Sequence, residues 1–97
     1  MAWIKIGAIT YMIEKVSTLR DEDGAELNGS INYSKARIKV RKGLDAQIVQ
    51  VVMWHETLHA ILIQAGLSGL DERAIEALAY GICGVLEDNR SMRRRSV

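Results

Sequence analysis

Hydrophobic and polar positions follow a strand-like pattern in the first part of this chain. Residues 3–16 are rich in Ile, Val, Tyr and Thr, which favour β-strands, and Gly7 is expected to bend or interrupt this segment. Residues 20–26, RDEDGAE, carry charge at almost every position around a glycine. They are predicted to form an exposed turn rather than part of the sheet.

A second strand-like region follows the charged turn. In residues 36–41, Ile38 and Val40 alternate with basic residues, so one face is predicted to be buried and the other to face water. Residues 28–33 precede this strand, and a turn at 34–35 is expected to join the two as a hairpin. The pattern predicts a small three-stranded, largely antiparallel sheet. The strand at 36–41 is expected at an edge of the sheet. There it could pair with an extended peptide substrate, or its lysine and arginine residues could protect the edge against aggregation.

The pattern then becomes helical. No turn residue occurs between Asp45 and Ala65, and the segment is apolar on nearly every side, as in a helix central to the core. Asp45 is a suitable N-cap, and Gly66 is a suitable stop. We therefore predict a buried helix at about 45–65.

A second helix is predicted at about 69–88. Ser68 is a suitable first cap, with Asp71 reaching back to it as in a capping box, and Asn89 is a reasonable end. The apolar residues that repeat at helical spacing are Ile75, Leu78, Ala79, Ile82 and Leu86. Together the elements predict an α+β fold in which the sheet precedes two helices.

Composition and charge narrow the class of protein. The 97 residues fit one domain, predicted at 1–89, followed by a flexible basic tail at 90–97. The formal net charge of +1 gives no global field, so a nucleic-acid partner is not expected. Polar residues interrupt the apolar run at 49–63, which is too short for a membrane span, so no membrane partner is expected. The single cysteine fits a reducing compartment, and we expect a cytoplasmic protein that can form homo-oligomers.

Both histidines of the chain lie in one short stretch, MWHETLHAIL. His55 and His59 are four residues apart and therefore neighbours on one helix face, where two ring nitrogens can reach one zinc ion. Glu56 points to a different side and is placed to take a proton from a water molecule held by the metal. This spacing is the HExxH pattern of zinc metallopeptidases. The residues predict a zinc site with Glu56 as its catalytic carboxylate.

A catalytic zinc ion normally has three protein ligands, and the chain has no third histidine. If the second helix packs antiparallel to the first, Glu72 and Glu76 face the histidines. Glu76 is the preferred ligand, because its neighbours are apolar and an unpaired carboxylate among them would be costly. Glu72 is the alternative; it is less preferred, because an acidic residue near a helix start is already favoured by the helix dipole without a metal. Cys83 lies two turns further on and is expected to be a core residue.

These motifs resemble those of a known family. VMWHETLHAI together with EALA at 76–79 is similar to the motifs of ImmA/IrrE-like, gluzincin-type zincins, and GSINYSKARIKV is similar to the hairpin that precedes their active-site helix. The likeness extends to small phage- or prophage-encoded metallopeptidase-like proteins and covers about residues 3–89. It implies a minimal zincin-like fold, with zinc held by His55, His59 and Glu76 and with Glu56 as the catalytic residue. Tyr80 departs from the asparagine that usually follows this family's Glu-x-x-Ala.

The sequence thus predicts a zinc-dependent metallopeptidase-like protein that hydrolyses peptide bonds in a peptide or protein substrate. One alternative is a zincin-fold binding or regulatory module whose zinc site turns over little or no substrate; such a module could be encoded by a phage. The other is a structural protein in which the histidines form a buried hydrogen-bonded cluster without metal. Any of Tyr11, Tyr33 and Tyr80 could stabilise an oxyanion, although ordinary packing is the commoner role of such residues.

Overall fold

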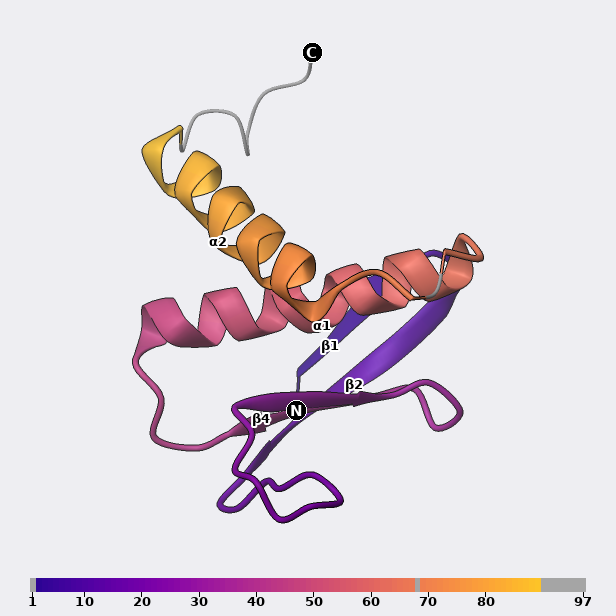
Figure 1. Ribbon diagram of the computed structural model, residues 1–97, viewed down its shortest axis with the longest axis vertical. Helices are drawn as coiled ribbons and strands as arrows, with labels where there is room; N and C mark the ends of the chain where they lie inside the picture. The colour runs from indigo at the N-terminus through magenta and orange to yellow at the C-terminus, as the bar shows by residue number, and fades with distance from the viewer. Residues whose placement is uncertain (1, 68, 90–97) are drawn as a thin grey trace.

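The computed structural model describes residues 2–67 and 69–89, which form an α+β fold with a four-stranded sheet and two helices. The strands lie on one side of the long helix, and the second helix crosses it from the other side (Figure 1). In chain order, the elements are β1 (Ala2–Ile6), β2 (Ile9–Val16), β3 (Gly29–Asn32), β4 (Arg37–Arg41), α1 (Ala46–Gln64) and α2 (Glu72–Asp88).

The predicted number of strands was wrong, because the first strand-like segment forms two strands. Ile6 pairs with Ile9 in the antiparallel β1–β2 hairpin, so only Gly7 and Ala8 make the turn. Gly7 has φ +60° and occupies the first central position, where two-residue hairpin turns take glycine. The Gln64 side chain donates a 2.8 Å hydrogen bond to the carbonyl of Ile6. The end of α1 is thereby tied to this hairpin.

The sheet is mixed rather than antiparallel throughout. Its strand order is β1-β2-β4-β3, with β2 and β4 parallel and the other two pairs antiparallel. The predicted 28–33 and 36–41 hairpin is present as β3 and β4. However, β4 lies inside the sheet, so neither edge role predicted for it holds. Its alternating residues explain this position, because Ile38 and Val40 are both 0% exposed. The outer strand on this side is β3.

The hydrophobic core lies between the sheet and one face of α1. Its buried members and the partly buried residues around them come from all four strands and from the helix. The rest of α1 is only partly covered by α2, since Ile48, Ile61 and Ile63 are each more than two-fifths exposed. The prediction that this helix is buried on nearly every side was therefore wrong. The buried core residues are Ile6, Tyr11, Ile38, Val40, Val52 and Ala60.

The ends of α1 agree with the sequence prediction. The Asp45 side chain caps the helix by accepting a hydrogen bond from the backbone of Gln47. At the other end Gly66 has φ +76°, and the backbone of Leu67 donates to the carbonyl of Leu62, which is the pattern of a glycine-terminated helix.

The second helix begins later than predicted. Asp71 is its N-cap and accepts a hydrogen bond from the backbone of Arg73, so the first helical residue is Glu72 rather than a residue near 69. The predicted capping box needed Asp71 inside the first turn, and its other member, Ser68, lies outside the described residues. Asn89 ends the helix, as predicted. The predicted basic tail at 90–97 also lies outside the described residues.

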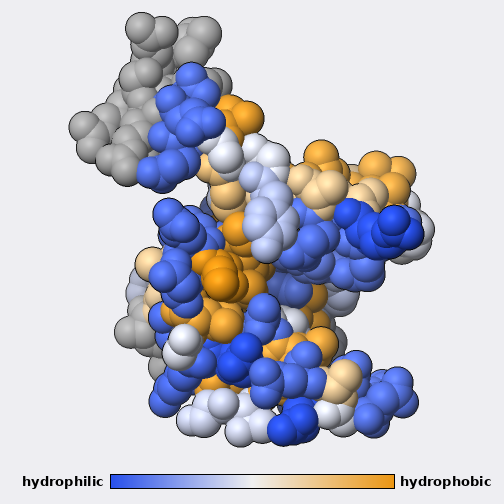
Figure 2. Space-filling model, turned by 60° about the vertical axis from the view of Figure 1, so that its left-hand side comes forward, coloured by the Kyte–Doolittle hydropathy of each residue, from blue (hydrophilic) through white to orange (hydrophobic). Residues whose placement is uncertain are grey.

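Within the described part of the chain, α2 contacts α1 and no strand. Only Ile75 and Ala79, in the first half of α2, are buried, and the second half extends away from the rest of the fold (Figure 1). Leu78 and Val85 are about half exposed. Figure 2 shows apolar surface (orange) in the upper part of the view as well as near its centre. Neither described helix is long and apolar enough to cross a membrane.

Candidate metal centre

The two histidines lie side by side on α1, as their spacing predicts. Their ring centroids are 4.9 Å apart, and the Nε2 atoms of His55 and His59 are 3.2 Å apart. Two ligands of a tetrahedral zinc ion, each about 2.0–2.1 Å from the metal, lie about 3.3–3.4 Å apart. The two Nε2 atoms therefore already have the separation that one ion requires.

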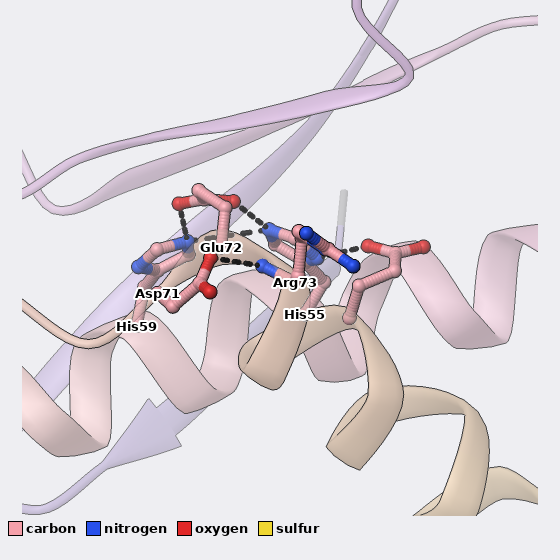
Figure 3. Close-up of polar contacts among 6 residues, drawn as sticks. His55, His59, Asp71, Glu72 and Arg73 are labelled. Carbon is pink, nitrogen blue, oxygen red and sulfur yellow. Dashed lines mark hydrogen bonds and ion pairs between the residues drawn. The ribbon is translucent and has the colours of Figure 1, made fainter.

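Glu72 brings a carboxylate to both of these nitrogens. Its Oε1 is 2.7 Å from Nε2 of His59, and its Oε2 is 3.0 Å from Nε2 of His55. Figure 3 shows the Glu72 side chain reaching from the start of α2 to the two rings on α1. One ligand atom from each of the three residues lies within 4.8 Å of the others, which makes them a possible metal-binding group. Two nitrogens and one carboxylate oxygen form a donor set that suits zinc.

Glu76 contacts the His55 ring at its second nitrogen, Nδ1. Its Oε2 lies 2.5 Å from Nδ1 of His55, on the side of the ring away from His59. Glu76 was the predicted third ligand, whereas the oxygens that meet both Nε2 atoms belong to Glu72. In metal sites the second nitrogen of a histidine usually donates to a carboxylate, which fixes the ring and its tautomer. The placement of Glu76 suits that supporting contact.

Glu56 is the buried acidic residue of the site. It is 5% exposed, and its Oε2 has no hydrogen-bond partner. Burial raises the pKa of Glu56 from its ordinary 4.5 to about 7; the nearby His55 lowers it, whereas Glu72 and Glu76 raise it further. Leaving a buried carboxyl oxygen unpaired is unfavourable, and such groups concentrate where proteins carry out chemistry.

This pKa shift predicts how the stability of the metal-free protein depends on pH. The folded state holds its proton on Glu56 up to about pH 7, whereas the unfolded chain loses it near 4.5. Stability should therefore fall as pH rises from about 4.5 to 7, by on the order of 2–3 kcal/mol. Urea unfolding at several pH values, with chelator present, measures this. Glu56→Gln should flatten this part of the profile, and an equally steep fall in that variant would contradict the assignment.

These residues surround a cavity of about 610 Å³ between α1, the first turns of α2 and β3. The β3 side is close to α1 because residue 29 is glycine: a Cβ there would collide with Cγ1 of Val52 and touch Cγ of Glu56. Gly29 was not among the residues predicted for the site. The sequence has a glycine there, but its contact depends on packing between distant segments. The walls also include Leu27, Asn28, Ser30, Ile31 and Tyr33.

Of the three tyrosines and the cysteine considered from the sequence, only one lines this cavity. Tyr33 lines the cavity, and burial, followed by the charge of Glu56, raises the pKa of its phenol, which favours the protonated, hydrogen-bond-donating form. Tyr11 is 1% exposed within the core, and Tyr80 is exposed on α2 away from this cavity. Cys83 lines a separate hollow with Trp54, and burial raises the pKa of its thiol. It takes no part in the histidine cluster.

No protein-family model, curated protein or solved structure matched this chain when it was compared with them. The resemblance to ImmA/IrrE-like zincins and to phage-encoded proteins therefore stays a prediction. What supports a function is therefore the geometry of the site itself.

Proposed function

We propose that His55, His59 and Glu72 bind one zinc ion between α1 and α2, and that Glu76 positions His55 from behind. The short distances between the two Nε2 atoms and the Glu72 carboxylate are the observation that carries this proposal. Glu72 replaces the sequence-based choice of Glu76, because Glu76 contacts Nδ1 instead. Such a site would make the fold a minimal zincin-like domain, with helix α1 carrying the metal and Glu56 together.

We propose further that this site hydrolyses peptide bonds. A zinc ion with three protein ligands supplies a Lewis acid for the carbonyl and makes a bound water molecule more acidic. Glu56 accepts the proton of the attacking water and then delivers it to the leaving amine. Its burial and unpaired Oε2 support this role, since a base must be free to take a proton. Tyr33, which also lines the cavity, is a hydrogen-bond donor available to the developing oxyanion.

The free edge of β3 supports a peptide as the substrate. The backbone of Arg41 donates to the carbonyl of Asn28, so alternation along the antiparallel pair directs the N–H and C=O groups of Gly29 and Ile31 away from β4. β3 is the outer strand, and both residues line the cavity. An extended peptide can add to this edge as a further strand, which would bring its backbone to the site.

The role of Glu76 gives a test within the same site. Glu76→Ala should weaken zinc affinity by roughly 10–100-fold, the usual effect of losing an outer carboxylate, and Glu76→Gln should lose less because its amide oxygen can still accept from Nδ1. Titration of the metal-free variants with zinc measures both. If Glu76→Ala abolishes binding while Glu72→Ala leaves it nearly intact, the two glutamates have the opposite roles and the sequence-based choice was right.

A zincin-fold binding or regulatory module is the second candidate function. The observation that favours it is the apolar surface that α2 leaves uncovered: Leu78 and Val85 are half exposed, as on a partner-binding helix. Zinc would then hold α2 against α1 without useful turnover. A zinc-loaded protein that cleaves none of a diverse peptide library would favour this function over hydrolysis.

A further inference from the structure

Apart from the two histidines, all the ionisable side chains of the described cavity lining that carry a charge are acidic. Glu56, Glu72 and Glu76 all line it, and no lysine or arginine is among the described residues that do. If zinc takes Glu72 and the two neutral histidines, Glu56 and Glu76 are the carboxylates left to face a substrate. The 5% exposed Glu56, with an unpaired Oε2, marks the cavity as a place where a ligand is expected.

Glu76 is the carboxylate that a substrate side chain can reach. One of its oxygens contacts Nδ1 of His55, yet its side chain is 48% exposed. The cavity is also lined by apolar side chains: Leu27 and Ile31 on the β3 side, and Val52 on α1 one turn before Glu56. An aliphatic stem that ends in a cation fits this combination, since such side chains bury the stem and leave the charged end near a carboxylate.

The same lining argues against a terminal carboxylate. An enzyme that removes C-terminal residues has to pair the negative end of its substrate with a cation or strong donors. In the described lining, the three glutamates carry one more negative charge than a zinc ion carries positive charge, so the net charge would repel that end. A peptide approached at an internal bond, or from its positively charged amino end, meets no such repulsion.

We propose that this cavity selects peptides with a cationic group beside the bond presented to His55, His59 and Glu72, chiefly a lysine or arginine side chain, and disfavours peptides with a carboxylate there. This inference rests on the proposed zinc site and deepens the proposed hydrolysis. The contact between the substrate cation and Glu76 supplies selectivity, and the apolar lining supplies affinity for the stem.

The experiment uses one set of eight-residue peptides, acetylated and amidated, that differ only at a central position: lysine, norleucine or glutamate. With zinc-loaded wild type, kcat/KM is measured for each peptide. With zinc-loaded Glu56→Gln, binding is measured by fluorescence anisotropy, which needs no turnover. We expect lysine to exceed glutamate by about tenfold in both assays, with norleucine between them. The ratio should shrink at 1 M salt because charges are screened there.

Two controls make the result specific. At saturating zinc, Glu76→Gln should reduce the lysine-to-glutamate ratio to about threefold or less, while Glu22→Gln, which removes the same charge from an exposed loop, should leave it unchanged. A norleucine peptide with a free amino end, compared with its acetylated form, separates an N-terminal ammonium from a side-chain cation.

Equal binding of the lysine and glutamate peptides, or tighter binding of the glutamate peptide, would overturn the proposed selectivity. An undiminished ratio in Glu76→Gln would overturn the assignment to Glu76. If zinc-loaded wild type cleaves none of the peptides while lysine is still preferred in binding, the hydrolytic function fails and the selectivity holds.

Discussion

Glu56→Gln is expected to reduce peptide cleavage by between about 10² and 10⁴ in kcat while the protein still binds one zinc ion. Glutamine fills nearly the same space as the buried glutamate but cannot accept a proton from water. The affinity for zinc should change little, because Glu56 is not among the three residues whose ligand atoms meet. Cleavage of a peptide library by wild type and variant, each with measured zinc content, tests this directly.

The variant also separates hydrolysis from binding. Wild type and Glu56→Gln should bind the same peptides with similar affinity, since the substitution keeps the shape of the cavity. Equal cleavage rates in the two proteins would show that another group, or a contaminating peptidase, carries the reaction. No cleavage by zinc-replete wild type would remove the hydrolytic function and leave the zinc-dependent binding module as the better account.

Zinc is expected to raise the melting temperature of this protein strongly. The proposed ligands come from both helices, and α2 contacts only α1 within the described chain, with just two buried residues. A metal joining His55 and His59 to Glu72 therefore supplies a large part of what holds α2 in place. Free zinc at one hundred times its dissociation constant adds about 2.7 kcal/mol, which for a domain of this size is roughly 10–20 °C.

Glu72→Ala should remove most of this rise, which thermal unfolding with and without zinc, followed by circular dichroism, measures. Glu72 is at the exposed start of α2, so the metal-free variant should fold much as wild type does. Glu22→Ala, in an exposed loop, is the matched control and should keep the full rise. An unchanged rise in Glu72→Ala would exclude Glu72 as a ligand, and no rise in wild type would exclude the metal site altogether.

Local features of the fold were readable in the sequence. The alternation at Ile38 and Val40 correctly predicted the buried face of a strand. Asp45 and Gly66 correctly predicted the ends of α1, because helix caps depend on only a few neighbouring residues. The parallel pairing of β2 with β4 joins segments more than twenty residues apart and leaves no local pattern. Gly7 was recognised as an interruption, but whether it bends one strand or joins two depends on what each part pairs with.

In the site too, the local features were predictable from the sequence and those that depend on packing were not. The i, i+4 spacing placed His55 and His59 together because a helix alone determines their separation. The choice between Glu72 and Glu76 depends on where α2 begins and how it crosses α1. The predicted helix began earlier and ran antiparallel to the first, whereas α2 starts at Glu72 and crosses α1 obliquely (Figure 1). Its first turn therefore meets the Nε2 atoms, and the next turn meets Nδ1 of His55.

The most direct test of the proposed centre is a crystal structure of the zinc-loaded protein with anomalous diffraction recorded on both sides of the zinc absorption edge. We predict one zinc peak about 2.0–2.2 Å from Nε2 of His55, Nε2 of His59 and a carboxylate oxygen of Glu72, with Glu76 remaining on Nδ1 of His55. Absence of a peak between α1 and α2, or a peak coordinated by Glu76 in place of Glu72, would contradict this account.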